Sequence, residues 1–416
     1  MDCTIISIGT ELSLGLVLDT NSKYIADSLY SLGIEVKYIH TLRDDQEEIS
    51  NIVKFSLNQT ELIVISGGLG PTDDDLTRKG VADALGLKLT RDKGLDETSL
   101  KFIRKIKAES VKERLLRQSF IPEGSLSFKP RVGSASGFGI EHKGRWVFCI
   151  PGVPREMEDM LENNVIPKIK EIKSRNKEKI SIKKEILMTT DISETEIENS
   201  IKDLLMGAGK KNVKIGITAE PGLIKIILIS VNHGKYLKEI EKEICKRLGN
   251  KVYGKNRVEI GYHLREAIKS VKQPITICTA ESITGGLISD MITAIPGSSD
   301  YFLGGIVSYS NYAKTKLLDV TETIIANKGA VSKEVCLEMA KGAKKQFGSD
   351  FSLAVTGYAG PEEEKVGLAY CCILYPDNSH ELFEKKFVGT RKDIKFRTAQ
   401  FIINRLRIRL KENFRL

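Results

Sequence analysis

The sequence lacks the features of a secreted, membrane-spanning or disulfide-stabilised protein. Over its 416 residues no apolar run approaches the roughly 20 residues that cross a bilayer, and its amino terminus has no basic-then-apolar signal pattern. The seven cysteines are scattered, odd in number and without a Cys-x-x-Cys pair, which argues against a disulfide framework or a zinc site. We therefore expect a protein of the reducing cytoplasm that has no membrane segment.

Histidine is scarce and internal repetition is absent. The five histidines are dispersed. A catalytic serine–histidine pair could still form between residues that are distant in the sequence, but no histidine is a specific candidate for it. No low-complexity linker and no repeated unit of 20–50 residues is visible, which excludes solenoids and propellers.

Positive charge is in excess and is concentrated in the middle of the chain. The net charge is +9, and residues 167–258 hold 21 Lys/Arg against 12 Asp/Glu, an excess of nine. A basic segment can contact nucleic acid. The lysines are dispersed, however, and no aromatic residues are interleaved for base stacking, so a solvated lysine-rich surface is the favoured interpretation.

Apolar patterning divides the chain into three predicted domains. Residues 1–167 alternate strand and helix patterns, which predicts a parallel sheet with helices on both faces. Asn21 is the expected cap of the first long helix. Residues 168–256 have the mixed pattern of a small α+β domain, and residues 257–416 form a second α/β unit. The expected strands are residues 3–8, 35–39, 62–66, 146–150, 223–231, 275–279, 303–309, 351–355, 367–374 and 381–387.

A glycine-rich loop with three consecutive aspartates follows the third strand. Glycines at this place let backbone N–H groups approach a ligand, but the loop matches neither a Walker motif nor a dinucleotide fingerprint. A hard metal with oxygen ligands would reconcile Asp74 and Asp75 with a phosphate, and Glu11 can converge on the same sheet edge. The alternative is an acidic helix amino terminus that complements the helix dipole. Arg155, in a proline-framed turn, is a further candidate phosphate contact.

The segment 275–286 places Ser282 at the turn between a buried strand and a helix that Gly285 and Gly286 open. This geometry can expose a serine hydroxyl, and the free N–H groups at the start of the helix can hold an oxyanion or a phosphate. A serine helix cap is the alternative.

Three further residues are candidates in the same domain. Lys314 lies in the first turn of a helix that Ser310 or Asn311 caps, where the dipole and burial would both favour its neutral form. A neutral lysine is the base that a serine–lysine mechanism requires, although an exposed surface lysine is the alternative. Thr356 ends a strand before a glycine loop, and Arg391 precedes the last helix, where it could hold a phosphate or carboxylate.

Over nearly its whole length the sequence resembles the CinA family. The resemblance rests on seven strings in conserved order: Gly-Thr-Glu at 9–11, Gly-Gly-Leu-Gly-Pro-Thr-x-Asp-Asp-x-Thr at 67–77, Pro-Gly-Val-Pro-x-Glu-Met at 151–157, Ala-Glu-Ser-x-Thr-Gly-Gly at 280–286, Tyr-Ser-Asn-x-Ala-Lys at 309–314, Gly-Ala-Val-Ser at 329–332 and Thr-Gly-x-Ala-Gly-Pro at 356–361.

For the C-terminal domain the resemblance implies a nicotinamide mononucleotide deamidase that needs no cofactor. Ser282 matches the nucleophile and Lys314 its base. The residues expected to position the substrate are Tyr309, Thr284, Gly285, Thr356 and Arg391.

For the rest of the chain the resemblance implies a molybdopterin-binding-like first domain and a KH-like connector. The first domain is associated in the family with ADP-ribose pyrophosphatase activity that depends on a divalent metal (Mg, Mn or Co), with Asp74, Asp75 and Glu11 as expected ligands. Its expected ligand-binding residues are Gly67, Gly68, Gly70 and Thr72. The family is typically a homodimer, and nucleic acid is an unlikely but open partner.

The chain departs from the family pattern at three places. Ile283 stands where the family often has cysteine, residues 190–195 replace a Gly-x-Gly-Glu-Ser string, and the loop after Pro361 is shortened and charged. A second hypothesis is a nucleotide- or nucleic-acid-binding regulator, related to competence or DNA damage, whose sites bind without catalysis.

Overall fold

The computed structural model describes most of the chain and divides it into two compact units, Met1–Lys183 and Lys184–Leu416. The described residues are 1–95, 116–175, 182–209, 212–220, 222–231, 234–360 and 365–413. The domain boundaries predicted at residues 167 and 256 stay predictions.

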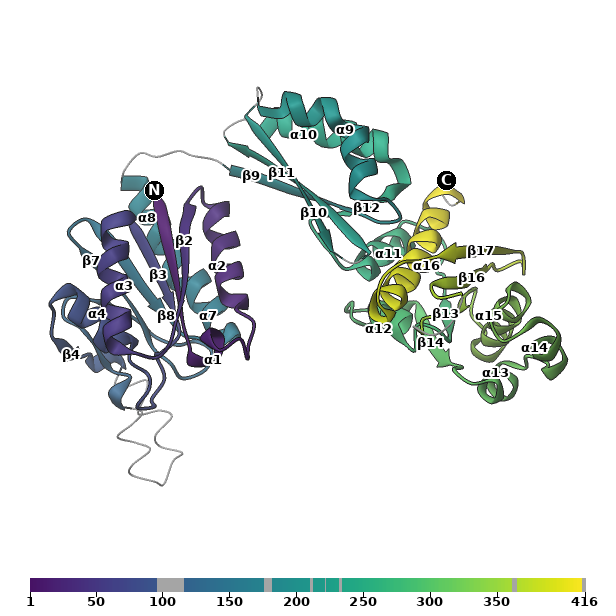
Figure 1. Cartoon of the computed structure of the whole chain (residues 1–416), viewed down its shortest axis with the longest axis horizontal. Coiled ribbons are helices and arrows are strands. Elements are labelled where there is room, and N and C mark those ends of the chain that lie inside the picture. The colour runs from purple at the N-terminus through teal and green to yellow at the C-terminus, as the bar shows by residue number, and fades with distance from the viewer. Residues whose placement is uncertain are drawn as a thin grey trace. The chain divides into compact units, whose positions relative to one another are not determined.

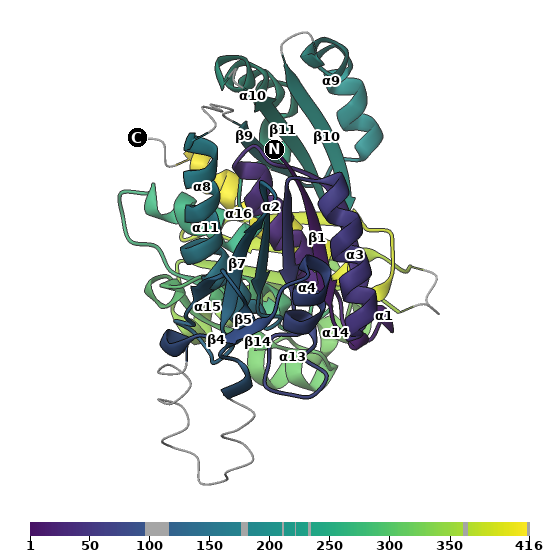
Figure 2. The same ribbon diagram turned by 90° about the vertical axis from the view of Figure 1, so that its left-hand side faces the viewer.

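The first unit contains a mixed sheet with strand order β2-β1-β3-β8-β7-β6 (Figures 1 and 2). Strands β2, β1, β3 and β8 are mutually parallel, as the alternating pattern predicts, but β7 and β6 run antiparallel at one edge. The expectation of a wholly parallel sheet is therefore wrong at that edge, because short hairpin connections there replace helical crossovers. The strands are β1 (Asp2–Ile8), β2 (Glu35–Leu42), β3 (Leu62–Ser66), β6 (Leu126–Phe128), β7 (Gly137–His142), β8 (Arg145–Ile150) and a separate pair, β4 (Leu89–Arg91) and β5 (Phe120–Pro122).

Helices cover both faces of this sheet. One apolar cluster joins the strands to α2, α7 and α8, and another joins them to α3 and α4, because alternate residues of each buried strand point to opposite faces. Asp19 caps α2 by accepting the Ser22 N–H at 2.9 Å, so the prediction of an Asn21 cap is wrong. The helices are α1 (Thr10–Ser13), α2 (Thr20–Ser31), α3 (Gln46–Gln59), α4 (Thr77–Leu85), α7 (Pro154–Met160), a π-helical turn (Leu161–Val165) and α8 (Ile166–Arg175).

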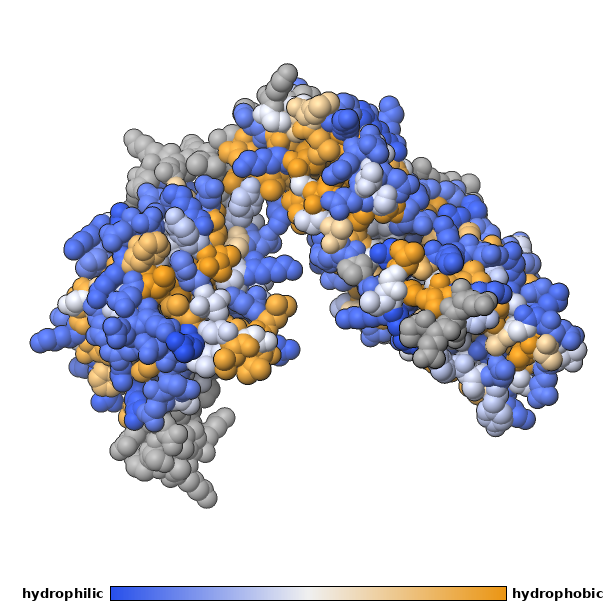
Figure 3. All heavy atoms as spheres, in the orientation of Figure 1, coloured by the Kyte–Doolittle hydropathy of each residue, from blue (hydrophilic) through white to orange (hydrophobic). Residues whose placement is uncertain are grey.

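The second unit begins with a four-stranded sheet, order β10-β11-β9-β12, and two helices, which confirms an α+β middle segment. Its likeness to a KH domain stays a prediction. Hydrophilic side chains cover α9 and α10, whereas apolar side chains gather over β9–β11 (Figure 3). The elements are β9 (Ile182–Thr189), α9 (Glu194–Ala208), β10 (Val213–Glu220), β11 (Leu223–Val231), α10 (Gly234–Leu248), a 3-10 turn (Gly249–Lys251) and β12 (Val252–Lys255).

The remainder of the second unit is a three-layer α/β arrangement, as predicted. Its sheet has the order β14-β13-β15-β16-β17, with β14, β13 and β15 parallel and β16 and β17 antiparallel. The strands are β13 (Ile277–Glu281), β14 (Phe302–Val307), β15 (Phe351–Gly357), β16 (Leu368–Leu374) and β17 (His380–Lys386).

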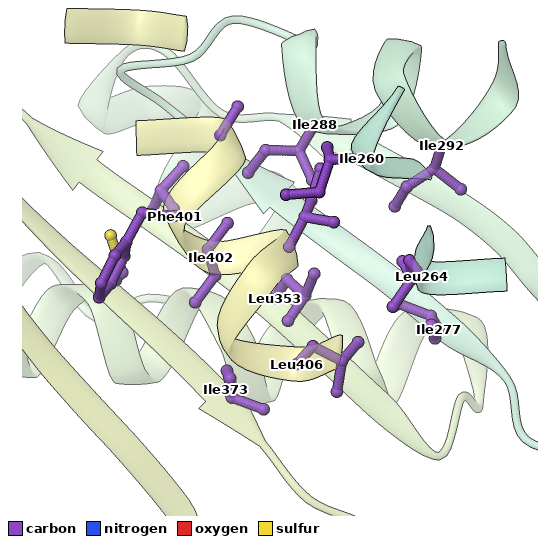
Figure 4. Packing of buried hydrophobic residues seen from close by; sticks show 14 of the residues in the cluster. Ile260, Leu264, Ile277, Ile288, Ile292, Leu353, Ile373, Phe401, Ile402 and Leu406 are labelled. Carbon is purple, nitrogen blue, oxygen red and sulfur yellow. The ribbon is translucent and has the colours of Figure 1, made fainter. Parts of the chain in front are cut away.

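Two apolar clusters enclose this sheet. Helices α11, α12 and α16 pack on one face and α15 on the other. Figure 4 shows α16 laying Phe401, Ile402 and Leu406 among residues from α11, α12 and the sheet. The helices are α11 (Ile260–Lys269), α12 (Leu287–Thr293), a 3-10 turn (Ser298–Asp300), α13 (Asn311–Leu318), α14 (Glu322–Lys328), α15 (Lys333–Phe347) and α16 (Arg391–Asn413).

Within the described residues, every helix is too short or too polar to cross a membrane.

Candidate functional sites

Ser282 lies at a tight turn between β13 and α12. Strand β13 ends at the preceding residue, and the Ser282 N–H donates to the Val355 carbonyl at 3.0 Å, which anchors the turn to the neighbouring strand β15. The chain then passes through Gly285 (φ 61°) and Gly286 (φ 95°) before the helix begins. Both values lie in the left-handed region that favours glycine, so the Gly-Gly pair is what permits so short a connection.

Lys314 reaches Ser282 from the adjacent strand and helix. Strand β14 runs parallel to β13, and Ser310 caps the following helix by accepting the Ala313 N–H at 3.1 Å. The Lys314 side chain is 2% exposed, and its Nζ donates to Ser282 Oγ at 3.1 Å. Its Nζ also donates to the Ser308 carbonyl at 2.9 Å. The two residues that the sequence nominated as nucleophile and base are therefore in direct contact.

The electrostatic environment favours a neutral Lys314 amine. Burial lowers the pKa of Lys314 below its ordinary value of 10.5, since removal from water penalises the charged form. Within the described residues Lys314 makes no ion pair, and its acceptors are a hydroxyl and backbone carbonyls. A neutral amine 3.1 Å from a hydroxyl can accept its proton.

The buried carboxylate of Glu281, next to Ser282, accepts hydrogen bonds from the start of α12. Glu281 is fully buried, and its oxygens accept the N–H groups of Gly286 (3.0 Å), Ile288 (3.0 Å) and Ser289 (2.8 Å) as well as the Ser289 hydroxyl (2.7 Å). The negative charge thus lies on the amino terminus of α12, where the helix dipole stabilises it. The expectation that these helix-start N–H groups are free for an oxyanion is wrong, because Glu281 occupies them.

Two other N–H groups of the turn remain available. Those of Ile283 and Thr284 have no acceptor in the described part of the chain, whereas the Gly285 N–H donates to the Ser282 carbonyl at 3.2 Å. The Thr284 hydroxyl is fully buried and also lacks a protein partner among described residues. The N–H groups near Ser282 that have no acceptor among the described residues are therefore those of the two residues that directly follow it.

Exposed residues flank the Ser282–Lys314 pair. Tyr309 is 63% exposed, and its hydroxyl accepts a hydrogen bond from Arg391 at 2.9 Å, so two predicted substrate-binding residues meet. Thr356 is buried at the end of β15, and its hydroxyl donates to the Ala330 carbonyl at 3.1 Å. The first three residues of the charged loop after Pro361, residues 362–364, lie outside the described residues.

A second site lies in the first unit, in a cavity of about 480 Å³ at the carboxyl ends of β1, β3 and β8. Gly67, Gly68 and Gly70 line it, as do the three predicted metal ligands Glu11, Asp74 and Asp75. Gly67 has φ 108°, and a Cβ there would lie 2.0 Å from the Ile8 carbonyl oxygen, so glycine is required for the loop to lie against β1. Sequence reasoning thus located the rim of this cavity.

The aspartates of this loop differ in their contacts. Asp75 accepts the N–H groups of Gly70 at 2.7 Å and Thr72 at 2.8 Å, and the Thr72 hydroxyl also donates to it. Asp73 forms an ion pair with Arg117. Asp75 therefore closes its own loop, and its carboxylate does not cap α4. Of the three consecutive aspartates, Asp74 is the one that lines the cavity and whose carboxylate makes no hydrogen bond or ion pair with the described residues.

Sequence reasoning missed two residues with buried, unpartnered oxygen atoms in this cavity. Asn21 Oδ1 and Glu156 Oε2 are buried and lack protein partners in the described chain, and both residues line the cavity. Burial also raises the pKa of Glu156. Arg155, the candidate phosphate contact, is exposed and does not line the cavity, whereas the next residue does. The sequence feature that could have identified Glu156 is the Glu of the Pro-Gly-Val-Pro-x-Glu string. It follows the turn by one residue, and its side chain lines the cavity.

The donor set of the cavity fits a hard cation but is not a preformed metal cluster. Among the described residues no group of three or more His, Cys, Asp or Glu side chains is close enough to hold a metal. The cavity lining nevertheless contains six carboxylates and neither lysine nor arginine: Glu11, Asp19, Asp44, Asp74, Asp75 and Glu156. A divalent cation binds buried oxygen atoms that have no hydrogen-bond partner and carboxylates that have no basic side chain beside them.

Fold and sites together define a two-unit α/β protein with a buried serine–lysine pair in one unit and an acidic cavity in the other. Among known families, the model described as "CinA C-terminal domain" matches residues 263–410, and the one described as "Probable molybdopterin binding domain" matches residues 4–171. A CinA-like protein of Geotalea uraniireducens is 35% identical over 423 residues, which cover 99% of this chain and 98% of the relative. A CinA-like protein of Dictyoglomus turgidum is 34% identical and covers 96% and 97%. The chain belongs to the CinA family.

Solved structures similar to the chain include two with more than 30% sequence identity. The CinA structure from Thermoplasma acidophilum, whose function is unknown, is 31% identical with a TM-score of 0.38, and covers 41% of this chain and 97% of its own. The corresponding structure from Agrobacterium tumefaciens is 32% identical with a TM-score of 0.36, and covers 38% and 98%.

Proposed function

We propose that the chain is an amidohydrolase that converts nicotinamide mononucleotide to nicotinate mononucleotide and ammonia. The observation that carries the proposal is the 3.1 Å contact between Ser282 Oγ and a buried Lys314 amine that has no carboxylate partner among the described residues. The substrate comes from the resemblance to the CinA family, and the cationic Arg391 beside Tyr309 suits a nucleotide phosphate.

The proposed mechanism uses this pair twice. The neutral Lys314 amine takes the Ser282 proton as Oγ attacks the carboxamide carbon, and the N–H groups of Ile283 and Thr284 hold the oxyanion. The Lys314 ammonium returns its proton to the leaving nitrogen, so that ammonia departs and a serine ester remains. Lys314 then deprotonates a water, which cleaves the ester, releases the carboxylate product and regenerates the serine.

Ammonia release from nicotinamide mononucleotide tests this proposal. Ser282→Ala and Lys314→Met are expected to lower kcat at least about 1000-fold, because residues that act as a unit lose nearly all of their joint effect together. Lys316→Met, two residues along α13 at an exposed position, is the matched control and should retain wild-type activity. A Ser282→Ala variant that turns over the substrate at the wild-type rate would contradict the assignment of Ser282 as the nucleophile.

The alternative, a regulator that binds nucleotides without catalysis, predicts a different result. In that case the wild-type chain binds nicotinamide mononucleotide in a titration but releases no ammonia at any pH. Oligonucleotide binding through the basic middle segment, with an affinity that falls steeply as salt increases, would favour the nucleic-acid form of this alternative.

We propose a second, metal-dependent activity on ADP-ribose for the first unit. Its cavity presents six carboxylates and no basic side chain, so a pyrophosphate can enter only together with cations. Glu11, Asp74, Glu156 and Asn21 would hold a divalent metal, which when bound would polarise the phosphoryl oxygens. The protein groups would orient it, and the glycine loop would let the diphosphate approach the backbone.

ADP-ribose hydrolysis with and without added Mg²⁺, Mn²⁺ or Co²⁺ tests this second activity. Asp74→Asn should lower the metal-dependent rate by about 10-fold or more, since it removes a charged ligand. Asp73→Asn, on the neighbouring aspartate that faces Arg117, is the matched control. A rate that is indifferent to a chelator would refute the metal assignment.

A further inference from the structure

Lys395, on the first turns of α16, lies against the turn that carries Ser282. A Cβ placed on Gly285 would be 3.4 Å from the Lys395 amine nitrogen and 4.0 Å from its Cε. Gly285 itself donates its N–H to the Ser282 carbonyl. The lysine amine is therefore adjacent to the reacting segment, although the sequence motifs do not include it.

The Lys395 ammonium has no protein counter-charge. In the described chain it makes neither an ion pair nor a hydrogen bond, although its side chain is half-buried. The acid two residues earlier, Asp393, is committed to the Thr390 N–H and hydroxyl, both at 2.8 Å, and these bonds lower its pKa. Glu281, the buried acid of the turn, is committed to α12.

Lys395 shares a helix face with Arg391. Residues four apart on a helix are neighbours, so these two cations lie side by side and repel each other. Arg391 is held by the Tyr309 hydroxyl, whose residue also offers its carbonyl to Lys314 at 3.5 Å. Both cations thus flank the catalytic pair, and an anion placed between them would remove the repulsion.

We propose that Lys395 is a specificity-determining residue whose ammonium binds the phosphate of the nucleotide substrate. The inference rests on the deamidase function proposed above and deepens it. A phosphate monoester carries up to two negative charges, which matches the two cations, and the Lys314 amine adds no third charge when it is neutral. The carboxamide, a neutral group on the cationic pyridinium ring at the other end of the same substrate, is left for Ser282. The enzyme then distinguishes the nucleotide from its dephosphorylated nucleoside by this contact.

Steady-state kinetics on both compounds test the proposal. For Lys395→Met we expect the KM for nicotinamide mononucleotide to rise on the order of tenfold or more with kcat little changed, because a charge-assisted hydrogen bond is lost. The kcat/KM for nicotinamide riboside should stay at the wild-type value, and Lys395→Arg should restore the nucleotide KM. Lys392→Met, on the same turn at an exposed position, is the matched control.

Binding measurements separate this proposal from the proposed function. Calorimetric titration of the full-length Ser282→Ala chain with nicotinamide mononucleotide should show tight binding that Lys395→Met weakens, and inorganic phosphate should compete only when Lys395 is present. If the wild-type chain releases no ammonia but this dependence on Lys395 holds, the deamidase fails and the phosphate contact stands. Equal effects of Lys395→Met on the nucleotide and the nucleoside, or no effect on either, would overturn the phosphate contact.

Discussion

At the scale of single residues, burial shifts the protonation of Lys314 toward the neutral amine, because removal from water penalises the charged form. Lys314 is buried without a carboxylate partner in the described chain, which costs stability as long as it is protonated. In the proposed mechanism the neutral amine is the reactive form. Stored electrostatic strain of this kind is typical of a functional site and not of a structural core.

The pH dependence of ammonia release should follow Lys314. Because the neutral amine is the proposed base, kcat/KM should fall as the pH falls through the lowered pKa of Lys314, and the acid limb should lie below the ordinary lysine value of 10.5. A pH–rate profile of the wild-type chain measures this limb. An acid limb that stays at the ordinary lysine value of 10.5 would contradict the burial argument.

The stability of the same unit provides an independent check. The unfolded chain holds a proton on Lys314 up to about 10.5, whereas the folded chain loses it at lower pH. Between these two values the unfolded state binds more protons, so the free energy of unfolding should rise as the pH rises. In Lys314→Met this part of the pH dependence should disappear, and the variant should be at least as stable as the wild type at neutral pH. Chemical denaturation at several pH values measures both effects.

At the scale of elements, Glu281, the last residue of β13, holds together the turn that leads to α12. Glu281 ends the strand, and its carboxylate accepts four hydrogen bonds from the beginning of the helix. Its carbonyl also accepts the Ser308 N–H at 2.8 Å, which ties the turn to the strand that leads to Lys314. One side chain therefore sets the position of the nucleophile relative to both the helix and the base.

Glu281→Gln should impair catalysis more than substrate binding. The amide replaces one acceptor oxygen by an NH₂ group that faces N–H donors, so kcat should fall about 10- to 100-fold and the free energy of unfolding by about 1–3 kcal/mol. The KM should change little, since Glu281 does not line the substrate side. Ser289→Ala removes one of the four hydrogen bonds and keeps the carboxylate, so its effect should be smaller. A normal kcat in a destabilised Glu281→Gln protein would reduce this residue to a purely structural role.

Most elements could be predicted from local pattern, and the errors have physical causes. The strand before Ser282 begins and ends two residues later than predicted, since strand ends depend on pairing with β14 and β15. The cap of α2 is Asp19 because Asn21 is drawn to Ser66 and Gly152 of other segments. The antiparallel edge formed by β6 and β7 is set by short connections that periodicity does not reveal.

At the scale of the whole molecule, the middle segment shares a core with the C-terminal α/β part of the second unit. Met188, Leu223 and Tyr253, from β9, β11 and β12, belong to the same buried cluster as the helices around the C-terminal sheet. The sequence pattern predicted a connector with its own boundary at 256. The buried cluster makes it a contributor to the stability of the C-terminal α/β part.

Leu223→Ala should therefore destabilise one unit and spare the other. Leu223 is 3% exposed, and loss of a buried leucine side chain costs about 2–5 kcal/mol. Thermal unfolding of the full chain should show the transition of residues 184–416 shifted to lower temperature, with the transition of residues 1–183 unchanged. Leu303→Ala, at a position 44% exposed on β14, is the matched control. A shift of both transitions would mean that the two units unfold as one.

The sequence by itself determined the alternation of strands and helices, the glycine turns and the identity of the serine and lysine, because periodicity and turn chemistry are local properties of the chain. Only the tertiary structure decided which groups near the serine are free. The carboxylate of Glu281 occupies the helix N–H groups, the amine of Lys314 loses its water, and Lys395 is brought to Gly285 from more than a hundred residues away. These outcomes depend on distances across the sheet and on burial, and neither is a property of any stretch of sequence alone.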